Sequence, residues 1–162
     1  MPAKLLWIIA ICATCIACDN SPSNERAPID SGTARALNES LSHEYANLRK
    51  QQIGDVDYQL SVVLSKDKTV FSGRVVIDFD LVPDNSQAIT LDYDSGEINA
   101  ISVNGIQVTP DYKRWFVTLP SELFHDGRNQ IVIDYRRPYA TDGSGLHRFV
   151  DPETNEVYLY TD

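Results

Sequence analysis

The sequence predicts an all-β fold, an antiparallel sandwich, preceded by one short helix and a signal peptide. Apolar residues alternate at period two through most of the chain after residue 54, which is typical of strands with one buried face. Turn-forming residues separate these segments at short intervals, and no segment of helical length lies between them. Strands joined by such short connections pair antiparallel, so their sheets should stack as a sandwich.

Length, charge and cysteine positions limit what the protein can be. A chain of 162 residues allows one domain with a tail. Its 14 Lys and Arg against 23 Asp and Glu give a net charge of −9, which disfavours nucleic acid as a partner because phosphate backbones are repelled. All three cysteines, Cys12, Cys15 and Cys18, lie at the start, which leaves none downstream for a disulfide, a zinc site or a thiol nucleophile.

Residues 1–17 have the features of a secretory signal peptide. Lys4 supplies a positive charge, and an uninterrupted run of thirteen apolar or small residues follows it. A helix of that length spans about 20 Å, short of the roughly 30 Å hydrocarbon core of a bilayer. The run is therefore expected to be a signal and not a membrane span.

The end of this run resembles a bacterial lipobox, in which Cys18 would be the acylated residue, although Cys15 stands where the pattern usually has leucine. Acyl chains hold a protein stably to a membrane, so the lipid bilayer is an expected partner through Cys18. Asp19 resembles the signal that retains lipoproteins at the inner membrane. The expected location is the periplasmic side of a bacterial cell envelope, with ordinary signal cleavage or a retained anchor as alternatives.

A tether and a helix should follow. Residues 18–33 are rich in Asn, Ser, Pro and Gly, as a flexible tether is. A helix is expected over 34–53, because residues of one stripe recur three or four positions apart, and Gly54 should end it. The stripe consists of Leu37, Leu41, Tyr45, Leu48 and the polar Gln52.

A β-domain is expected over 54–162. Its strands are predicted at 56–64, 71–81, 89–93, 98–103, 106–108, 115–119, 130–135 and 157–161. Asn104-Gly105 between two β-branched segments predicts a hairpin, because both turn positions need positive φ. The strand aromatics are expected in the sandwich core, with a sugar-binding face as the alternative: Tyr58, Phe71, Phe79, Tyr93, Trp115, Phe116 and Tyr135.

Histidines offer no metal site in the sequence. His43, His125 and His147 form no H-E-x-x-H pattern, which a zinc hydrolase of that type needs. His147 is expected to be a solvated or hydrogen-bonded loop residue. The neighbouring Gly143-Ser144-Gly145 lacks the third glycine of a dinucleotide-binding pattern, so a flexible loop is expected there.

Two pairs of aspartates lie at same-face spacing on predicted strands. Asp78 and Asp80 form one pair, and Asp92 and Asp94 form the other. Such pairs can bind Ca²⁺ or share a proton. On the strands of an acidic protein, solvated charges that discourage strand aggregation are the expected interpretation.

One segment carries a more specific pattern, DGSGLHRFVDPE at 142–153, which continues as EVYLYT at 156–161. This segment resembles the N-terminal domain of the M1 family of zinc aminopeptidases, the aminopeptidase N group. Shorter family-like segments occur in the same order, so the resemblance covers roughly residues 40–162. They are ANLR at 46–49, IGDVDY at 53–58, FSG at 71–73, LDY at 91–93, VNG at 103–105 and GRN at 127–129.

The resemblance implies a saddle-like β-sandwich that covers a separate catalytic domain, which would be the partner of this chain. Tyr160 and Thr161 match a family motif near the substrate-binding region, and Asp162 stands where the family has glutamine. The family's glutamate that holds a substrate amino group would follow two positions beyond. Such a carboxylate selects a free amino terminus because it pairs with the ammonium.

The family's zinc belongs to the full-length enzyme, and its H-E-x-x-H and G-A-M-E-N motifs are missing from this chain. We therefore expect no catalytic residue, metal site or cofactor here, and no activity of the chain alone. An incomplete β-domain should also expose unpaired strand edges and an apolar face. The alternative is a stand-alone, lipid-anchored periplasmic β-sandwich that binds a peptide or envelope protein through Trp115 and the tyrosines or the 142–153 loop.

Overall fold

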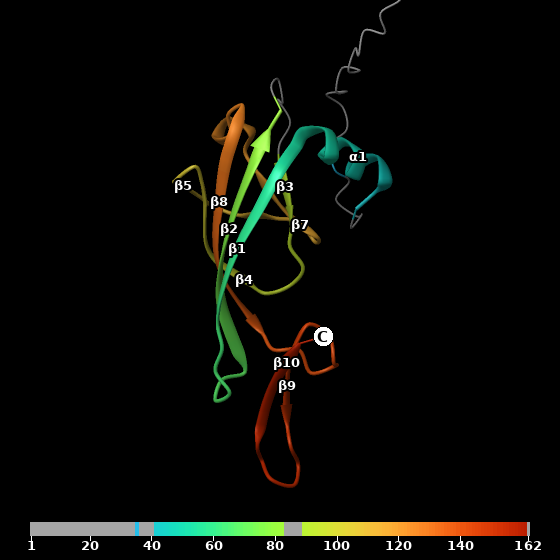
Figure 1. The fold of residues 1–162 in the computed structure, drawn as a ribbon, viewed down its shortest axis with the longest axis vertical. Helices are drawn as coiled ribbons and strands as arrows, with labels where there is room; N and C mark the ends of the chain where they lie inside the picture. Colours follow the sequence, from blue (N-terminus) through green and yellow to red (C-terminus); the bar gives the residue numbers. More distant parts are fainter. Residues whose placement is uncertain (1–34, 36–40, 83–88, 162) are drawn as a thin grey trace, which may run out of the picture.

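The computed structural model describes residues 35, 41–82 and 89–161, and the predicted signal peptide, Cys18 and the tether lie outside them. Antiparallel strands dominate the described residues, and one α-helix packs near one end of the main sheet (Figure 1). The predicted all-β fold with one short helix is confirmed. No helix in these ranges has both the length and the apolar character that crossing a bilayer requires.

Two sheets and a separate hairpin make up the fold. The main sheet has the order β1-β2-β8-β4-β5, the second sheet has the order β3-β7-β6, and β9 pairs with β10. The strands of the main sheet are β1 (Ile53–Val63), β2 (Val70–Leu81), β8 (Gly127–Pro138), β4 (Glu97–Val103) and β5 (Ile106–Val108). The others are β3 (Ile89–Asp92), β7 (Phe116–Leu119), β6 (Asp111–Tyr112), β9 (Leu146–Val150) and β10 (Val157–Thr161), and a 3-10 turn spans Ser121–Leu123.

The core lies between the main sheet and the three-stranded sheet. Its strands supply mostly β-branched and leucine side chains at every second position, as the period-two pattern predicts. The buried cluster consists of Ile77, Phe79, Leu81, Ile89, Ile98, Ile101, Val103, Val117, Leu119, Ile131 and Ile133. The packing is that of a sandwich, but it covers only one end of the long strands β2 and β8 (Figure 1).

The helix is shorter than the predicted 34–53. Helix α1 spans His43–Gln52 and begins after Ser42, whose hydroxyl accepts a hydrogen bond from the Tyr45 N–H at 3.2 Å. Strand β1 begins directly at Ile53, so Gly54 lies within the strand and does not end the helix, contrary to the prediction. The β-branched Ile53 already pairs with β2, and this pairing ends the helix one residue earlier.

The alternation in β1 was predicted correctly, but the burial of its side chains was not. From Gly54 to Val63 every residue of β1 is exposed, because β1 is the outermost strand of the main sheet and pairs only with β2 in the described residues. Tyr58 is 66% exposed, which corrects its placement in the core. Of the other predicted core aromatics, Phe79 and Phe116 are buried and the remaining four are partly buried.

Two family-like segments meet at the turn between β4 and β5. The Asn104-Gly105 hairpin is confirmed, with φ values of 50° and 82°. The Asn104 amide donates a 2.9 Å hydrogen bond to Oδ1 of the buried Asn129. The Asn129 Nδ2 group in turn donates to the carbonyls of His125 and Gly127 at 2.6 and 2.8 Å. The VNG and GRN segments therefore form one hydrogen-bonded corner.

Candidate functional site

The segment with the most specific pattern folds into a hairpin that extends beyond the main sheet (Figure 1). In it Tyr160 of β10 pairs with His147 of β9, and Thr161 pairs with Leu146. The GLHRF and YLYT parts of the pattern thus lie side by side. Tyr160 and Thr161 are exposed, and the third predicted residue, Asp162, lies outside the described residues.

His147 lies in a strand and not in a loop, which corrects part of the prediction. The residue is 6% exposed, and its ring centroid is 4.8 Å from that of Tyr160. The predicted hydrogen bond is present, because Nδ1 accepts from the Gly143 N–H at 2.9 Å. With Nδ1 as an acceptor, the neutral ring carries its proton on Nε2. Gly143 has a φ of 91°, which lets the loop turn back over the ring.

The DPE part of the pattern forms the turn between β9 and β10. Asp151 Oδ1 accepts hydrogen bonds from the N–H groups of Glu153 and Thr154 at 2.7 and 3.2 Å. These two bonds hold the pKa of Asp151 below its ordinary value. Asn155 then takes the left-handed conformation, with φ of 59°. This aspartate therefore shapes the turn.

Two side chains join the hairpin region to the turn between β1 and β2. The Arg148 guanidinium donates to the Lys66 carbonyl at 3.1 and 3.3 Å. The buried Tyr139 hydroxyl accepts from the Ser65 N–H at 2.9 Å and donates to the Ser65 carbonyl at 3.2 Å. Both sets of contacts set the position of the hairpin relative to the main sheet.

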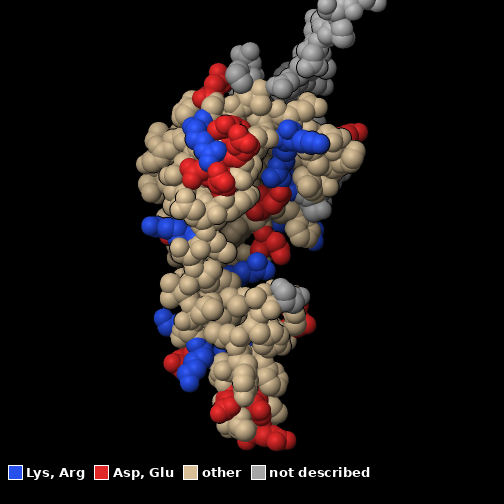
Figure 2. Space-filling view, viewed as in Figure 1, with Lys and Arg blue, Asp and Glu red and all other residues tan. Residues whose placement is uncertain are grey.

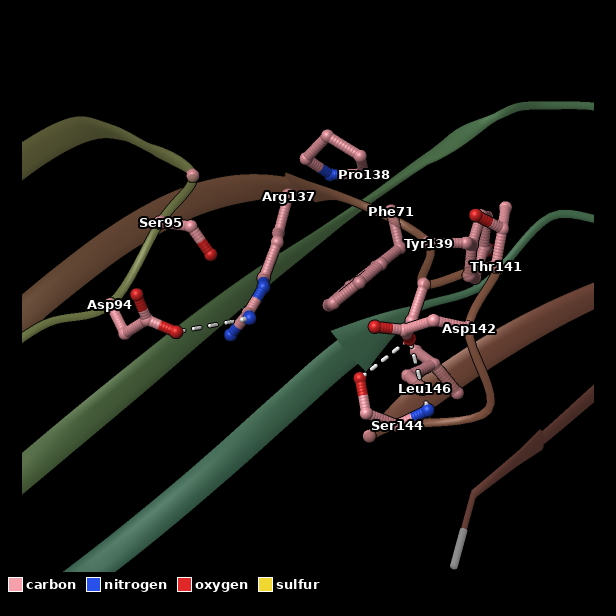
Figure 3. Close-up of a pocket in the computed structure, with 13 residues that line it drawn as sticks. Phe71, Asp94, Ser95, Arg137, Pro138, Tyr139, Thr141, Asp142, Ser144 and Leu146 are labelled. Atoms are coloured by element: carbon pink, nitrogen blue, oxygen red, sulfur yellow. Dashed lines mark hydrogen bonds and ion pairs between the residues drawn. The ribbon is translucent and has the colours of Figure 1, made fainter.

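A cleft of about 660 Å³ lies beside this hairpin (Figure 3). Phe71, Tyr139 and Leu146 contribute apolar surface to it. Figure 3 shows Arg137 pointing towards Asp94 on one side, while the loop around Asp142 borders the other. The guanidinium Nη2 of Arg137 lies 3.8 Å from Asp94 Oδ2, which is a loose ion pair.

Asp142 and Ser144 form a hydrogen-bonded pair at the edge of this cleft. Asp142 Oδ1 accepts from the hydroxyl and the N–H of Ser144 at 2.7 and 3.1 Å, and these bonds lower the pKa of Asp142. Asp142 therefore stays ionised, and its contacts with Ser144 hold the loop at the edge of the cleft. The face in Figure 2 carries acidic and basic side chains in mixed clusters. In the described ranges, no group of three His, Cys, Asp or Glu could hold a metal ion.

The aspartate pairs are held mostly by ion pairs and hydrogen bonds. Asp78 accepts from the Gln130 amide at 3.0 Å, and Asp80 lies 3.6 Å from the Arg128 guanidinium. Asp94 forms the loose ion pair with Arg137 at the cleft. Asp80 and Asp94 remain 45% and 73% exposed, so the predicted solvated charges are present and also form these contacts.

Asp92 belongs to an arginine cluster that no sequence pattern indicated. Its carboxylate binds Arg49 of α1 and, at 2.5 Å, Arg35. The Arg35 side chain is buried, with its guanidinium carbon 4.1 Å from the centroid of the Phe116 ring. The ANLR and LDY segments thus meet through Arg49 and Asp92, whereas Arg35 lies outside the family-like segments.

Comparison with known proteins finds a similar sequence and similar solved structures. No family model matches the sequence. Aminopeptidase N of Streptomyces lividans is 25% identical over 126 residues, which cover 75% of this chain and 14% of that protein. The chain is similar to M1 zinc peptidases over their N-terminal region. The resemblance predicted from the sequence is thereby confirmed.

Solved structures show the same fold. Native yeast LTA4 hydrolase superposes with a TM-score of 0.55 at 13% identity, over 68% of this chain and 18% of that chain. A second structure of native leukotriene A4 hydrolase from Saccharomyces cerevisiae gives a TM-score of 0.53 at 12% identity, over 68% of this chain and 19% of that chain. At this identity the likeness shows the fold, and the chain spans less than a fifth of either structure.

Proposed function

We propose that this chain is the N-terminal, non-catalytic domain of an M1-type zinc aminopeptidase, whose complete form removes N-terminal residues from peptides. The match to aminopeptidase N over 126 residues carries this proposal. The chain spans 14% of that protein, so the activity, the zinc and the substrates belong to the proposal for the complete enzyme. The catalytic domain is the proposed partner, and the exposed Tyr160 and Thr161 are the proposed contact with its substrate-binding region.

The chain by itself should not hydrolyse peptides. The described histidines lie on separate elements, with His43 in α1, His125 before β8 and His147 in β9. The described residues do not fit a zinc site, because they contain no cluster of potential ligands. The purified 162-residue chain with added Zn²⁺ should therefore release no p-nitroaniline from leucine p-nitroanilide above the buffer rate. Turnover that a chelator abolishes would contradict this part of the proposal.

The decisive experiment is to sequence the coding DNA beyond codon 162 and to measure the intact mass of the native protein. A frame that continues to a glutamate two codons on and then to H-E-x-x-H supports the enzyme. A stop codon, with a native mass equal to a lipidated chain that begins at Cys18, overturns it. In that case we propose the lipid-anchored binding module instead of the enzyme domain. The feature that favours this second candidate is the cleft with its apolar floor.

The proposed location is the periplasmic side of a bacterial envelope, at the inner membrane, through an acylated Cys18. Radiolabelled palmitate should enter the wild-type protein and the Cys15→Ser variant, and it should not enter Cys18→Ser. Equal labelling of the wild-type protein and Cys18→Ser would overturn the anchor. The outcome bears on the location alone, since either function can operate on a membrane.

A further inference from the structure

We propose that the outer edge of β1 is a self-association site, at which two copies of this chain pair their β1 strands antiparallel. β1 is the last strand of the main sheet, with β2 on its inner side. Its outer edge pairs with no strand of the described ranges. An unpaired edge exposes a row of N–H and C=O groups that another strand can satisfy.

Most of this edge lacks the features that normally prevent pairing. Proteins protect edge strands with charges, prolines, bulges or short length. In β1 the bulge and both charges, Asp55 and Asp57, lie in the first five residues. The remaining YQLSVV, at 58–63, has no charge, proline or glycine. Leu60 and Val63 within it are 64% and 68% exposed.

The opposite edge of the same sheet shows the contrast. β5 (Ile106–Val108) is only three residues long, so it offers few groups for pairing. β1 has eleven residues. The two edges therefore differ in length while they belong to one sheet, and β1 is the edge suited to a second strand.

The charge distribution selects a second copy of this chain as the occupant. Antiparallel pairing of two β1 strands places the start of each beside the end of the other. The start carries Asp55 and Asp57, with Arg128 paired to Asp57 at 2.7 Å and Asp80 beside that arginine, so its net charge is negative. The turn after the end carries Lys66 and Lys68 with Asp67 between them. Each acidic start would thus meet a turn of net positive charge, twice in one dimer. A parallel arrangement would place like charges together.

The side-chain pattern selects the register. If Ser61 lies opposite Ser61 of the second copy, Leu60 lies opposite Val62 and Tyr58 opposite Leu64. All of these apolar side chains then share one face and gain cross-strand neighbours. A slip of one residue would place them opposite the polar face, which disfavours that register.

This inference is independent of the proposed function, because it uses only the edge and charges of this chain. Sedimentation velocity of the purified full chain should show a monomer–dimer equilibrium at concentrations up to on the order of 100 µM. The Ser61→Lys variant places two ammonium groups opposite each other at the twofold axis, so we expect the dimer Kd to rise at least about tenfold. Gln107→Lys on β5 adds the same charge to the other edge and should leave the Kd unchanged.

Hydrogen exchange gives a second measurement that needs no variant. The amides of residues 58–63 should exchange more slowly at high than at low protein concentration, and amides of β5 should not respond. A chain that stays monomeric over this range overturns the proposal. A dimer whose Kd is the same in Ser61→Lys, or whose Kd shifts equally in Gln107→Lys, also overturns it, because association would then use another surface.

Discussion

The inner strands and the outermost strand of the main sheet carry the same alternating pattern but differ in what covers them. The β3-β7-β6 sheet packs on β2, β8 and β4, and Phe79, Val103 and Leu119 are buried there. The outermost strand β1 bears Tyr58 and Leu60, which are mostly exposed although they lie beside Ile77 and Val75 of β2. Period two therefore predicts which side chains share a face, and the presence of a second layer decides whether that face is buried.

The largest expected effect compares two leucines, one in the core and one on the outermost strand. Leu119 is fully buried, so Leu119→Ala should lower the free energy of unfolding by about 2–5 kcal/mol through lost burial and a cavity. Leu60 is 64% exposed, so Leu60→Ala should cost less than about 0.5 kcal/mol. Urea unfolding followed by circular dichroism measures both. Equal losses of unfolding free energy in the two variants would mean that β1 is covered in solution. Repeating the Leu60→Ala measurement at lower protein concentration would then show whether a second copy covers it.

The next effect concerns the hydrogen-bonded corner of the VNG and GRN segments. Asn129→Ala removes the partners of the His125 and Gly127 carbonyls and of the Asn104 amide. Since buried polar groups without partners are costly, the free energy of unfolding should fall by about 2–3 kcal/mol. The matched control is Asn99→Ala, which changes an exposed side chain of β4 and should have little effect. A small loss in Asn129→Ala would mean that water replaces the amide.

A third effect concerns Gly73 of β2, where the Tyr135 side chain crosses the main sheet. A Cβ at Gly73 would lie 2.5 Å from the Tyr135 ring, which packs across the glycine. Gly73→Ala should therefore destabilise the protein by about 1–3 kcal/mol. Gly54→Ala is the control, because its Cβ would meet nothing within 4 Å. In a Tyr135→Leu background the cost of Gly73→Ala should shrink, and an unchanged cost in this double-mutant cycle would reject the steric cause.

Much of the fold could be predicted because strand signals are local. The Asn104-Gly105 hairpin and most strand positions follow from turn chemistry and alternation. The exposure of Tyr58 could not be predicted, since it depends on where a distant sheet ends. The buried Arg35 was also missed, because its partners Asp92 and Phe116 are far away in sequence. His147 was assigned to a loop because the preceding glycines hide the start of β9.

The family-like segments prove to be contact partners of one another. ANLR meets LDY through Arg49 and Asp92, and VNG meets GRN through Asn104 and Asn129. FSG leaves room for Tyr135 at Gly73. These segments therefore maintain the fold, which explains how they could indicate a family without containing a catalytic group. The candidate site, by contrast, depends on the exposed Tyr160 and Thr161, whose proposed contact is with a separate catalytic domain.

The smallest expected effect is an acid-dependent one on the solvent face of β2 and β8. The Arg74 guanidinium donates two hydrogen bonds of 2.7 Å to Asp134 and holds the pKa of that carboxyl below its ordinary value. A depressed pKa in the folded state adds stability above the ordinary value near 4, and this contribution is lost as the pH falls through the folded pKa. Asp134→Asn should therefore lower stability slightly at neutral pH, and the difference from the wild type should vanish in acid. Asp67→Asn in the exposed turn is the control, and a difference for Asp134→Asn that persists in acid would show that the pair acts through packing and not through charge.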